Sequence, residues 1–144
     1  MEINATGKGG QGVTQAGFSQ TLGITFEEHH AGTSRCSLKM RESFLNPNGV
    51  VHGGVIYTIV DTGMGLALWT LLRPEELCST IEIKINYLRP VVAGRLIAES
   101  RVVQRGSTVA VLESRVEDEA GKLVALATGS FHLAPKRNAE STTA

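Results

Sequence analysis

The sequence predicts one α+β domain in which an antiparallel sheet of five to six strands packs on one long central helix. Three observations indicate this fold class. A dense apolar stretch follows a turn sequence near the middle of the chain. Stretches of alternating apolar and polar residues then follow, joined by short links. Finally, 144 residues with 42% hydrophobic content are enough for one core, and nothing suggests a second domain.

We expect the domain to span residues 18–135, with flexible tails at 1–17 and 136–144. The first stretch is rich in Gly, Thr, Gln and Asn and the last is small and polar, so neither can bury much surface. The domain should begin with a short helix that breaks at Gly23 and runs into a first strand. From Thr33 onward, alternation predicts a half-buried strand with Cys36, Leu38 and Met40 on its apolar face.

The central helix is predicted to run from Gly53 to about Leu68, after the turn sequence Asn46-Pro47-Asn48-Gly49. Its apolar residues surround so much of the helix that we expect almost complete burial. These residues are Val55, Ile56, Ile59, Val60, Met64, Leu66, Ala67 and Leu68. The one carboxylate within the helix is Asp61, and a buried carboxylate needs a partner or a function.

Four strands are expected after the helix, at residues 80–88, 95–104, 108–117 and 122–133. Their short links favour a four-stranded antiparallel meander. In the first strand, alternation puts Thr80 on the face opposite Ile81, Ile83, Ile85 and Tyr87. One sheet can cover a single side of the helix, so its remaining apolar face should meet a second copy of the chain. We therefore expect at least a homodimer.

Composition and motifs exclude several classes of function. A net charge of +0 argues against nucleic-acid binding. No segment is long and apolar enough to span a membrane, and residues 1–20 lack a signal-peptide core, so we expect a cytoplasmic protein. Cys36 and Cys78 are expected to be free thiols. The pair His29-His30 has no partners at ligand spacing, so no metal site is expected.

Two features of the central stretch suggest chemistry. The glycines Gly53 and Gly54 would leave N–H groups at the positive end of the helix available to an oxyanion, such as that formed from a thioester carbonyl. Asp61 lies eight residues later, about 12 Å along the axis at about 1.5 Å per residue, too far to serve the same carbonyl. Antiparallel helices of two copies could bring them together. Alternatively, His52 only caps a turn, Asp61 has a structural partner, and Gly63 and Gly65 permit close helix packing.

Together these residues resemble a known family. The segments N-P-N-G-V-V-H-G-G, with Asp61 nine residues beyond His52, T-I-E-I-K-I-N-Y-L-R-P and V-V-Q-R-G-S-T-V-A are similar to those of the hot-dog-fold acyl-CoA thioesterases. The similarity is greatest to the phenylacetate-degradation type, which is related to the 4-hydroxybenzoyl-CoA thioesterases, and it covers residues 22–133. The resemblance implies a hot-dog fold, in which the sheet wraps around the central helix, and hydrolysis of an aryl or medium-chain acyl-CoA to free acid and coenzyme A.

The resemblance also implies roles for individual residues. Asn46 would help to place the thioester or the attacking water, and the Gly53 N–H, at the turn marked by His52, would bind the oxyanion. Asp61 of the neighbouring subunit would act as general base or nucleophile. Thr80, or Ser79 if the alignment slips by one, would assist the water.

The resemblance places the coenzyme A channel along two segments, and coenzyme A is part of the substrate, with no separate cofactor. Arg89 and Arg105 are candidate partners for its phosphates. A homotetramer is implied, and its packing mode is open. The alternatives are a non-catalytic acyl-CoA-binding hot-dog protein and an enoyl-CoA hydratase-like enzyme. The predicted channel residues are Tyr87, Arg89, Pro90, Gln104, Arg105, Gly106, Ser107 and Thr108.

Overall fold

A computed structural model describes residues 13–137, so most of both predicted tails lies outside the described residues. The predicted central helix ends within one residue of its observed end, and the strand predicted at residue 80 begins four residues earlier. In chain order the elements are α1 (Gly17–Leu22), β1 (Thr25–His30), β2 (Thr33–Lys39), a 3-10 turn (Glu42–Phe44), α2 (Gly53–Trp69), β3 (Glu76–Tyr87), β4 (Arg95–Arg105), β5 (Val109–Asp118) and β6 (Leu123–Pro135).

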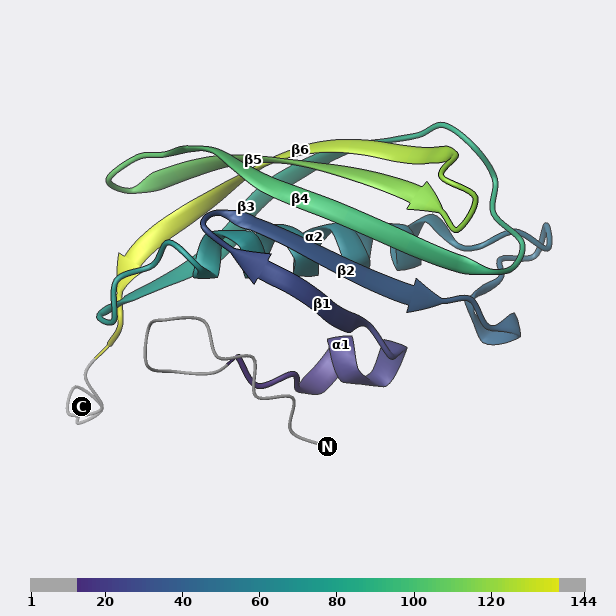
Figure 1. Cartoon of the computed structure of the whole chain (residues 1–144), viewed down its shortest axis with the longest axis horizontal. Helices are drawn as coiled ribbons and strands as arrows, with labels where there is room; N and C mark the ends of the chain where they lie inside the picture. Colours follow the sequence, from purple (N-terminus) through teal and green to yellow (C-terminus); the bar gives the residue numbers. More distant parts are fainter. Residues whose placement is uncertain (1–12, 138–144) are drawn as a thin grey trace.

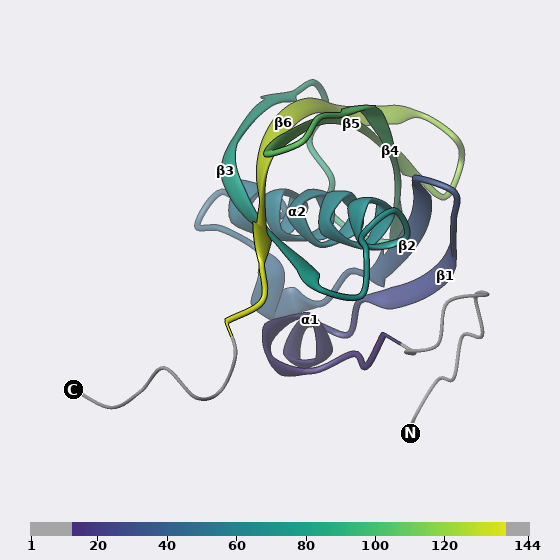
Figure 2. The same cartoon turned by 90° about the vertical axis from the view of Figure 1, so that its left-hand side faces the viewer.

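The six strands form one antiparallel sheet in the order β1-β2-β4-β5-β6-β3. Figure 1 shows this sheet lying across the length of α2, and Figure 2 shows it curled around the helix, with α1 beneath. The curl brings strands β2, β3, β4 and β5 into contact with α2. The predicted α+β class, with a sheet wrapped around one long helix, is confirmed.

The predicted four-stranded meander is wrong in one place. Strands β4, β5 and β6 do follow one another in space, but β3 pairs with β6 at the sheet edge and β4 pairs with β2. The link over residues 88–94 is too long for a tight hairpin and contains Pro90, which lacks an N–H. It crosses the end of the domain instead, where the Val91 carbonyl accepts a hydrogen bond from the Val51 N–H.

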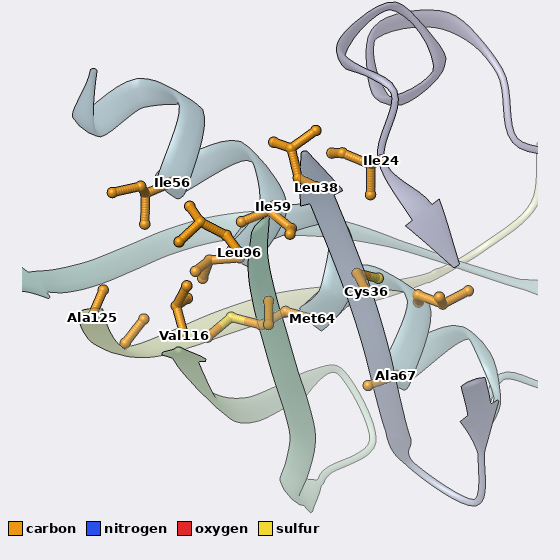
Figure 3. Close-up of a cluster of buried hydrophobic side chains, with 14 of the residues drawn as sticks. Ile24, Cys36, Leu38, Ile56, Ile59, Met64, Ala67, Leu96, Val116 and Ala125 are labelled. Atoms are coloured by element: carbon orange, nitrogen blue, oxygen red, sulfur yellow. The ribbon is translucent and has the colours of Figure 1, made fainter. Parts of the chain in front are cut away.

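The core fills the space between α2 and the sheet. Ile59 and Met64 of the helix pack with Leu96 and Val116 of the sheet, all of them fully buried (Figure 3). A stripe of α2 stays at least partly exposed, and it mixes polar residues with the apolar Val55, Tyr57 and Trp69, so the predicted apolar face is only partly present. Asp61 is on this stripe, so its expected burial is also incorrect for the single chain. We call the partly exposed residues of α2 the open stripe; it comprises Gly53, Gly54, Val55, Tyr57, Thr58, Asp61, Thr62, Gly65 and Trp69.

Residues near the predicted domain boundaries make contacts with the domain. Val13 packs against the core, and the Gln15 side-chain amide donates to the Ile24 carbonyl. At the other end, the Lys136 ammonium donates to the Pro74 carbonyl at 2.7 Å. Val13, Gln15 and Lys136, which lie just outside the predicted range of 18–135, thus contact the domain.

Gly63 allows the helix to approach the sheet closely. Ser34 Oγ donates to the Gly63 carbonyl at 2.6 Å, and a Cβ added to Gly63 would lie 2.8 Å from Ser100 Oγ. Ser100 Oγ is itself held by a hydrogen bond to Ser114 Oγ at 2.9 Å. The predicted role of Gly63 in close helix packing is confirmed.

Replacing Gly63 by alanine should therefore destabilise the domain. Overpacking costs about 1–3 kcal/mol, and the higher helix propensity of alanine offsets up to about 1 kcal/mol of this. Urea unfolding followed by circular dichroism measures the change. Gly65→Ala is the matched control, because a Cβ there would meet only Phe131 Cε1 at 3.9 Å. Equal stability of the two variants would contradict this account of the packing.

Candidate functional site

The turn before α2 is organised by Asn46. Its Oδ1 accepts hydrogen bonds from the N–H of Asn48 at 2.9 Å and of Val50 at 3.4 Å. Gly49 adopts a φ of 74° in this turn, a conformation that glycine tolerates well. The side-chain oxygen of Asn46 is thus used inside the turn, which leaves its NH2 group as the part that can contact a ligand.

His52 is the N-cap of α2. Its Nδ1 accepts a hydrogen bond from the Gly54 N–H at 2.8 Å, and its carbonyl accepts from the Val55 N–H at 2.9 Å. Within residues 13–137, the Gly53 N–H donates no hydrogen bond. The cap therefore satisfies the neighbouring amide and leaves the Gly53 amide available at the positive end of the helix.

Tyr87 packs against this first turn of α2. Its hydroxyl donates to the Gly53 carbonyl at 2.9 Å, and a Cβ added to Gly53 would lie 3.0 Å from Tyr87 Cζ. Burial, and to a lesser extent the neighbouring Tyr57, raises the pKa of the Tyr87 hydroxyl, so it remains a donor at neutral pH. Tyr87 was predicted as a channel residue; the structure puts it against Gly53, next to the exposed Arg89 and Pro90.

Asp61 is oriented by Thr80, whose Oγ1 donates to Asp61 Oδ1 at 2.6 Å. Alternation predicted Thr80 on the face opposite Ile83, but both side chains lie toward the helix. The reason is a β-bulge at Ile81, since Thr80 pairs with Phe131 while Glu82 pairs with the adjacent Ser130. The bulge reverses the alternation, and the contact favours Thr80 over Ser79 as the hydroxyl beside Asp61.

Cys78 also lies near Asp61, and the sequence analysis did not include it in the site. Burial, and then the negative charge of Asp61, raises the pKa of the Cys78 thiol, so it stays protonated at neutral pH and is not a thiolate nucleophile. Cys78 and Thr80 are two residues apart on one strand, so their side chains share a face, and this spacing could have placed Cys78 near Asp61. Cys36 is free as well, and burial raises its pKa to about 12.

The turn between β4 and β5 lies near the Asp61 end of β3. Its Arg105 forms a largely buried ion pair with Glu76, and the hydrogen bond from Arg105 lowers the pKa of the Glu76 carboxyl. Only glycine fits at position 106 of this tight turn, because a Cβ there would lie 2.6 Å from the Val109 carbonyl oxygen. The charge of Arg105 is thus already balanced, whereas Arg89 is exposed; Gln104, Ser107 and Thr108 are also exposed.

The predicted site residues fall into two groups in the single chain. The strand pairing of β6 with β3 puts Tyr87 opposite Ala125 and Thr80 opposite Phe131, a difference of six residues or about 20 Å along the sheet. We call the first set the helix-start group, which comprises Asn46, His52, Gly53, Tyr87, Arg89 and Pro90. The second set is the Asp61 group, which comprises Asp61, Thr80, Gln104, Arg105, Gly106, Ser107 and Thr108.

Neither group coincides with a metal site or with a hollow that the single chain forms. Among residues 13–137, no three His, Cys, Asp or Glu side chains are arranged to hold a metal ion. A hollow of about 580 Å³ lies on the outer face of the sheet, bordered by Lys84, Arg101 and Glu113, and none of the candidate residues lines it. Across the same part of the chain, no helix is long and apolar enough to cross a membrane.

One curled antiparallel sheet wrapped around a long central helix is the hot-dog fold. The Thioesterase superfamily matches residues 48–125, more than half of the chain, including Gly53, Asp61 and Thr80. The chain belongs to this superfamily and is a thioester hydrolase.

Individual relatives cover most of the domain. A Saccharolobus solfataricus protein, provisionally named an esterase, is 37% identical over 71% of this chain and 72% of its own length. Human acyl-coenzyme A thioesterase 13 is 30% identical over 81% of this chain and 84% of its own. The structure of the Escherichia coli PaaI protein from the phenylacetic acid degradation operon has a TM-score of 0.74 and 25% identity, covering 79% of this chain and 81% of that one.

Proposed function

We propose that this protein is an acyl-CoA thioesterase that hydrolyses an aryl or medium-chain acyl-CoA to the free acid and coenzyme A. The observation that carries the proposal is the presence of two half-sites on one chain: a Gly53 N–H without an intramolecular acceptor at the start of α2, and a carboxylate, Asp61, held by Thr80. The names of two relatives support the substrate class, since one is an acyl-coenzyme A thioesterase and the other belongs to a phenylacetate operon.

The complete site needs two subunits. Gly53 and Asp61 are about 12 Å apart along one helix, at about 1.5 Å per residue, so one chain cannot apply both to a single carbonyl. Both residue groups lie beside β3, one near each end of this edge strand. If two β3 edges meet antiparallel about a two-fold axis, the helix-start group of one chain faces the Asp61 group of the other. The exposed Ile81 on this strand favours such a contact. The family resemblance extends this dimer to a homotetramer.

Each residue then has a defined task. The Gly53 N–H and the positive end of α2 stabilise the negative charge on the thioester oxygen. Asp61 of the partner either removes a proton from water or attacks the carbonyl itself, and the geometry leaves both routes open. Its Oδ1 accepts a hydrogen bond from Thr80 Oγ1, which holds the carboxylate in place and leaves Oδ2 to accept the proton or to attack. As the C–S bond breaks, the coenzyme A thiolate leaves and takes up the proton that Asp61 removed from water; in the nucleophilic route, water then hydrolyses the Asp61 anhydride and supplies that proton. The exposed Arg89 would pair with a phosphate of coenzyme A.

Release of free thiol from a panel of acyl-CoAs tests the proposed function. We expect turnover of phenylacetyl-, benzoyl- and octanoyl-CoA by the purified oligomer, whose mass light scattering measures. An acyl-CoA-binding protein would bind these compounds and release no thiol. A hydratase would consume crotonyl-CoA with its thioester intact. Either of these results would overturn the proposed function.

A further inference from the structure

Tyr87 contacts the first glycine of α2 in two ways. Its hydroxyl donates to the Gly53 carbonyl at 2.9 Å, and its ring lies beside the Gly53 Cα. The three atoms nearest to a Cβ added at Gly53 all belong to Tyr87: Cζ at 3.0 Å, the hydroxyl oxygen at 3.2 Å and Cε1 at 3.4 Å. The tyrosine ring therefore occupies the place where a side chain of residue 53 would lie.

The peptide unit between Gly53 and Gly54 is held at both ends. Its carbonyl accepts from the Tyr87 hydroxyl, and its N–H, that of Gly54, donates to His52 Nδ1 at 2.8 Å. The preceding peptide unit is held through the His52 carbonyl, which accepts from the Val55 N–H at 2.9 Å. Because peptide units are planar, fixing the two units that flank the Gly53 Cα also fixes the direction of the Gly53 N–H.

This restraint matters because glycine has more backbone freedom than any other residue. Residues 53 and 54 have no side chain to limit their dihedral angles, and the first turn of α2 contains no acidic residue to interact with the helix dipole. A hydrogen-bond donor stabilises an oxyanion most when it is oriented before the reaction. The direction of the Gly53 N–H is therefore a property that a neighbouring side chain can set.

We propose that Tyr87 is a positioning residue for thioester hydrolysis, which holds the Gly53 peptide so that the Gly53 N–H points at the thioester oxygen. The inference rests on the proposed function, since it requires this N–H to bind the oxyanion. Tyr87 reaches the helix start because it is the last residue of β3 and shares a face of the strand with Ile83 and Ile85, which pack against the core.

The family resemblance implies a different role for Tyr87, in the wall of the coenzyme A channel. Tyr87 is 49% exposed, which leaves part of its ring accessible to a ligand. The two roles change different kinetic constants. A channel contact made equally in the ground state and the transition state affects KM, whereas a restraint on the oxyanion donor affects kcat.

The kinetics of Tyr87→Phe test the inference, with Tyr57→Phe as the matched control. Tyr57 lies one turn after Gly53 on α2, is partly exposed, and loses the same hydroxyl. With the best substrate of the acyl-CoA panel, kcat of Tyr87→Phe should fall by about three- to tenfold at an unchanged KM, the size of effect expected for one lost hydrogen bond. Tyr57→Phe should keep both constants at their wild-type values.

A second measurement separates positioning of the amide from general support of the fold. Asp61→Asn, which should bind the same acyl-CoA with little turnover, is mixed with substrate carrying 13C at the thioester carbonyl. A hydrogen bond to a carbonyl lowers its stretching frequency, so adding Tyr87→Phe to this variant should shift the infrared band of the bound carbonyl to higher frequency. Adding Tyr57→Phe instead should leave the band in place.

Each other outcome has a defined meaning. An unchanged kcat and an unchanged carbonyl band in Tyr87→Phe overturn the inference and leave the proposed function standing. A higher KM at an unchanged kcat assigns Tyr87 to the channel wall and also overturns it. A lower kcat with an unchanged band shows that Tyr87 does not act through the Gly53 N–H, and it overturns the inference as well. If the wild-type protein releases no thiol from any acyl-CoA, the proposed function and this inference both fail.

Discussion

Replacing Asp61 by asparagine should lower kcat for thioester hydrolysis by about 10²–10⁴-fold, the range expected for loss of a general base. The substitution keeps the shape of the side chain, and its carbonyl can still accept the hydrogen bond from Thr80 Oγ1. Asp61 is only partly buried, so the free energy of unfolding should change by no more than about 0.5 kcal/mol. Thiol release under saturating substrate measures the loss, and urea unfolding measures the stability.

Glu82→Gln is the matched control for this substitution. Glu82 lies on the same strand as Thr80, but on the outer face of the sheet, where its Oε1 accepts a hydrogen bond from Ser130 Oγ at 3.0 Å. The change removes the same charge from a similar hydrogen-bonded carboxylate that lies outside the site, and kcat should stay near the wild-type value. Wild-type turnover by Asp61→Asn would show that the carboxylate takes no part in the reaction.

The local geometry of Asp61 illustrates what the sequence could predict. The helix and the position of Asp61 on it follow from the spacing of the apolar residues. The division into two half-sites follows from the eight residues that separate Gly53 from Asp61 along the helix. The side-chain direction of Thr80 does not, because a single bulge at Ile81 reverses the alternation and leaves no mark in the sequence pattern. The open stripe was also missed, because its residues alternate with large buried ones around the same helix.

Strand order was predictable only where the links are short. The connections before β5 and β6 span few residues, and these strands are neighbours as expected. The link before β4 carries the chain past the start of α2, directly after Tyr87, the last residue of β3, which contacts Gly53. The composition of residues 88–94 suggests a turn, but it does not specify which strand β4 pairs with in the sheet. The contact of Tyr87 with the helix start thus depends on a topology that local patterns do not encode.

Replacing Gly53 by proline should lower kcat by about 10²–10³-fold relative to Gly53→Ala, because only proline removes the N–H proposed to bind the oxyanion. Both variants add a Cβ near Tyr87 Cζ, so they share that disturbance. Proline is favoured at the first helical position, and His52, with φ −60° and ψ 133°, has the extended conformation required before proline. The two variants should therefore unfold at similar urea concentrations. Equal kcat values would exclude the Gly53 N–H as an oxyanion donor.

Mixed dimers of Gly53→Pro and Asp61→Asn chains determine whether the two groups act across subunits. If each site takes Gly53 from one chain and Asp61 from the other, a mixed dimer has one doubly altered site and one intact site. Co-expression with two different affinity tags isolates oligomers that contain both chains, and each mixed dimer in them should regain about half of the wild-type activity from two nearly inactive parents. If both groups served one site within a chain, every site of the mixed dimer would carry one substitution, and activity would stay at the level of the parents.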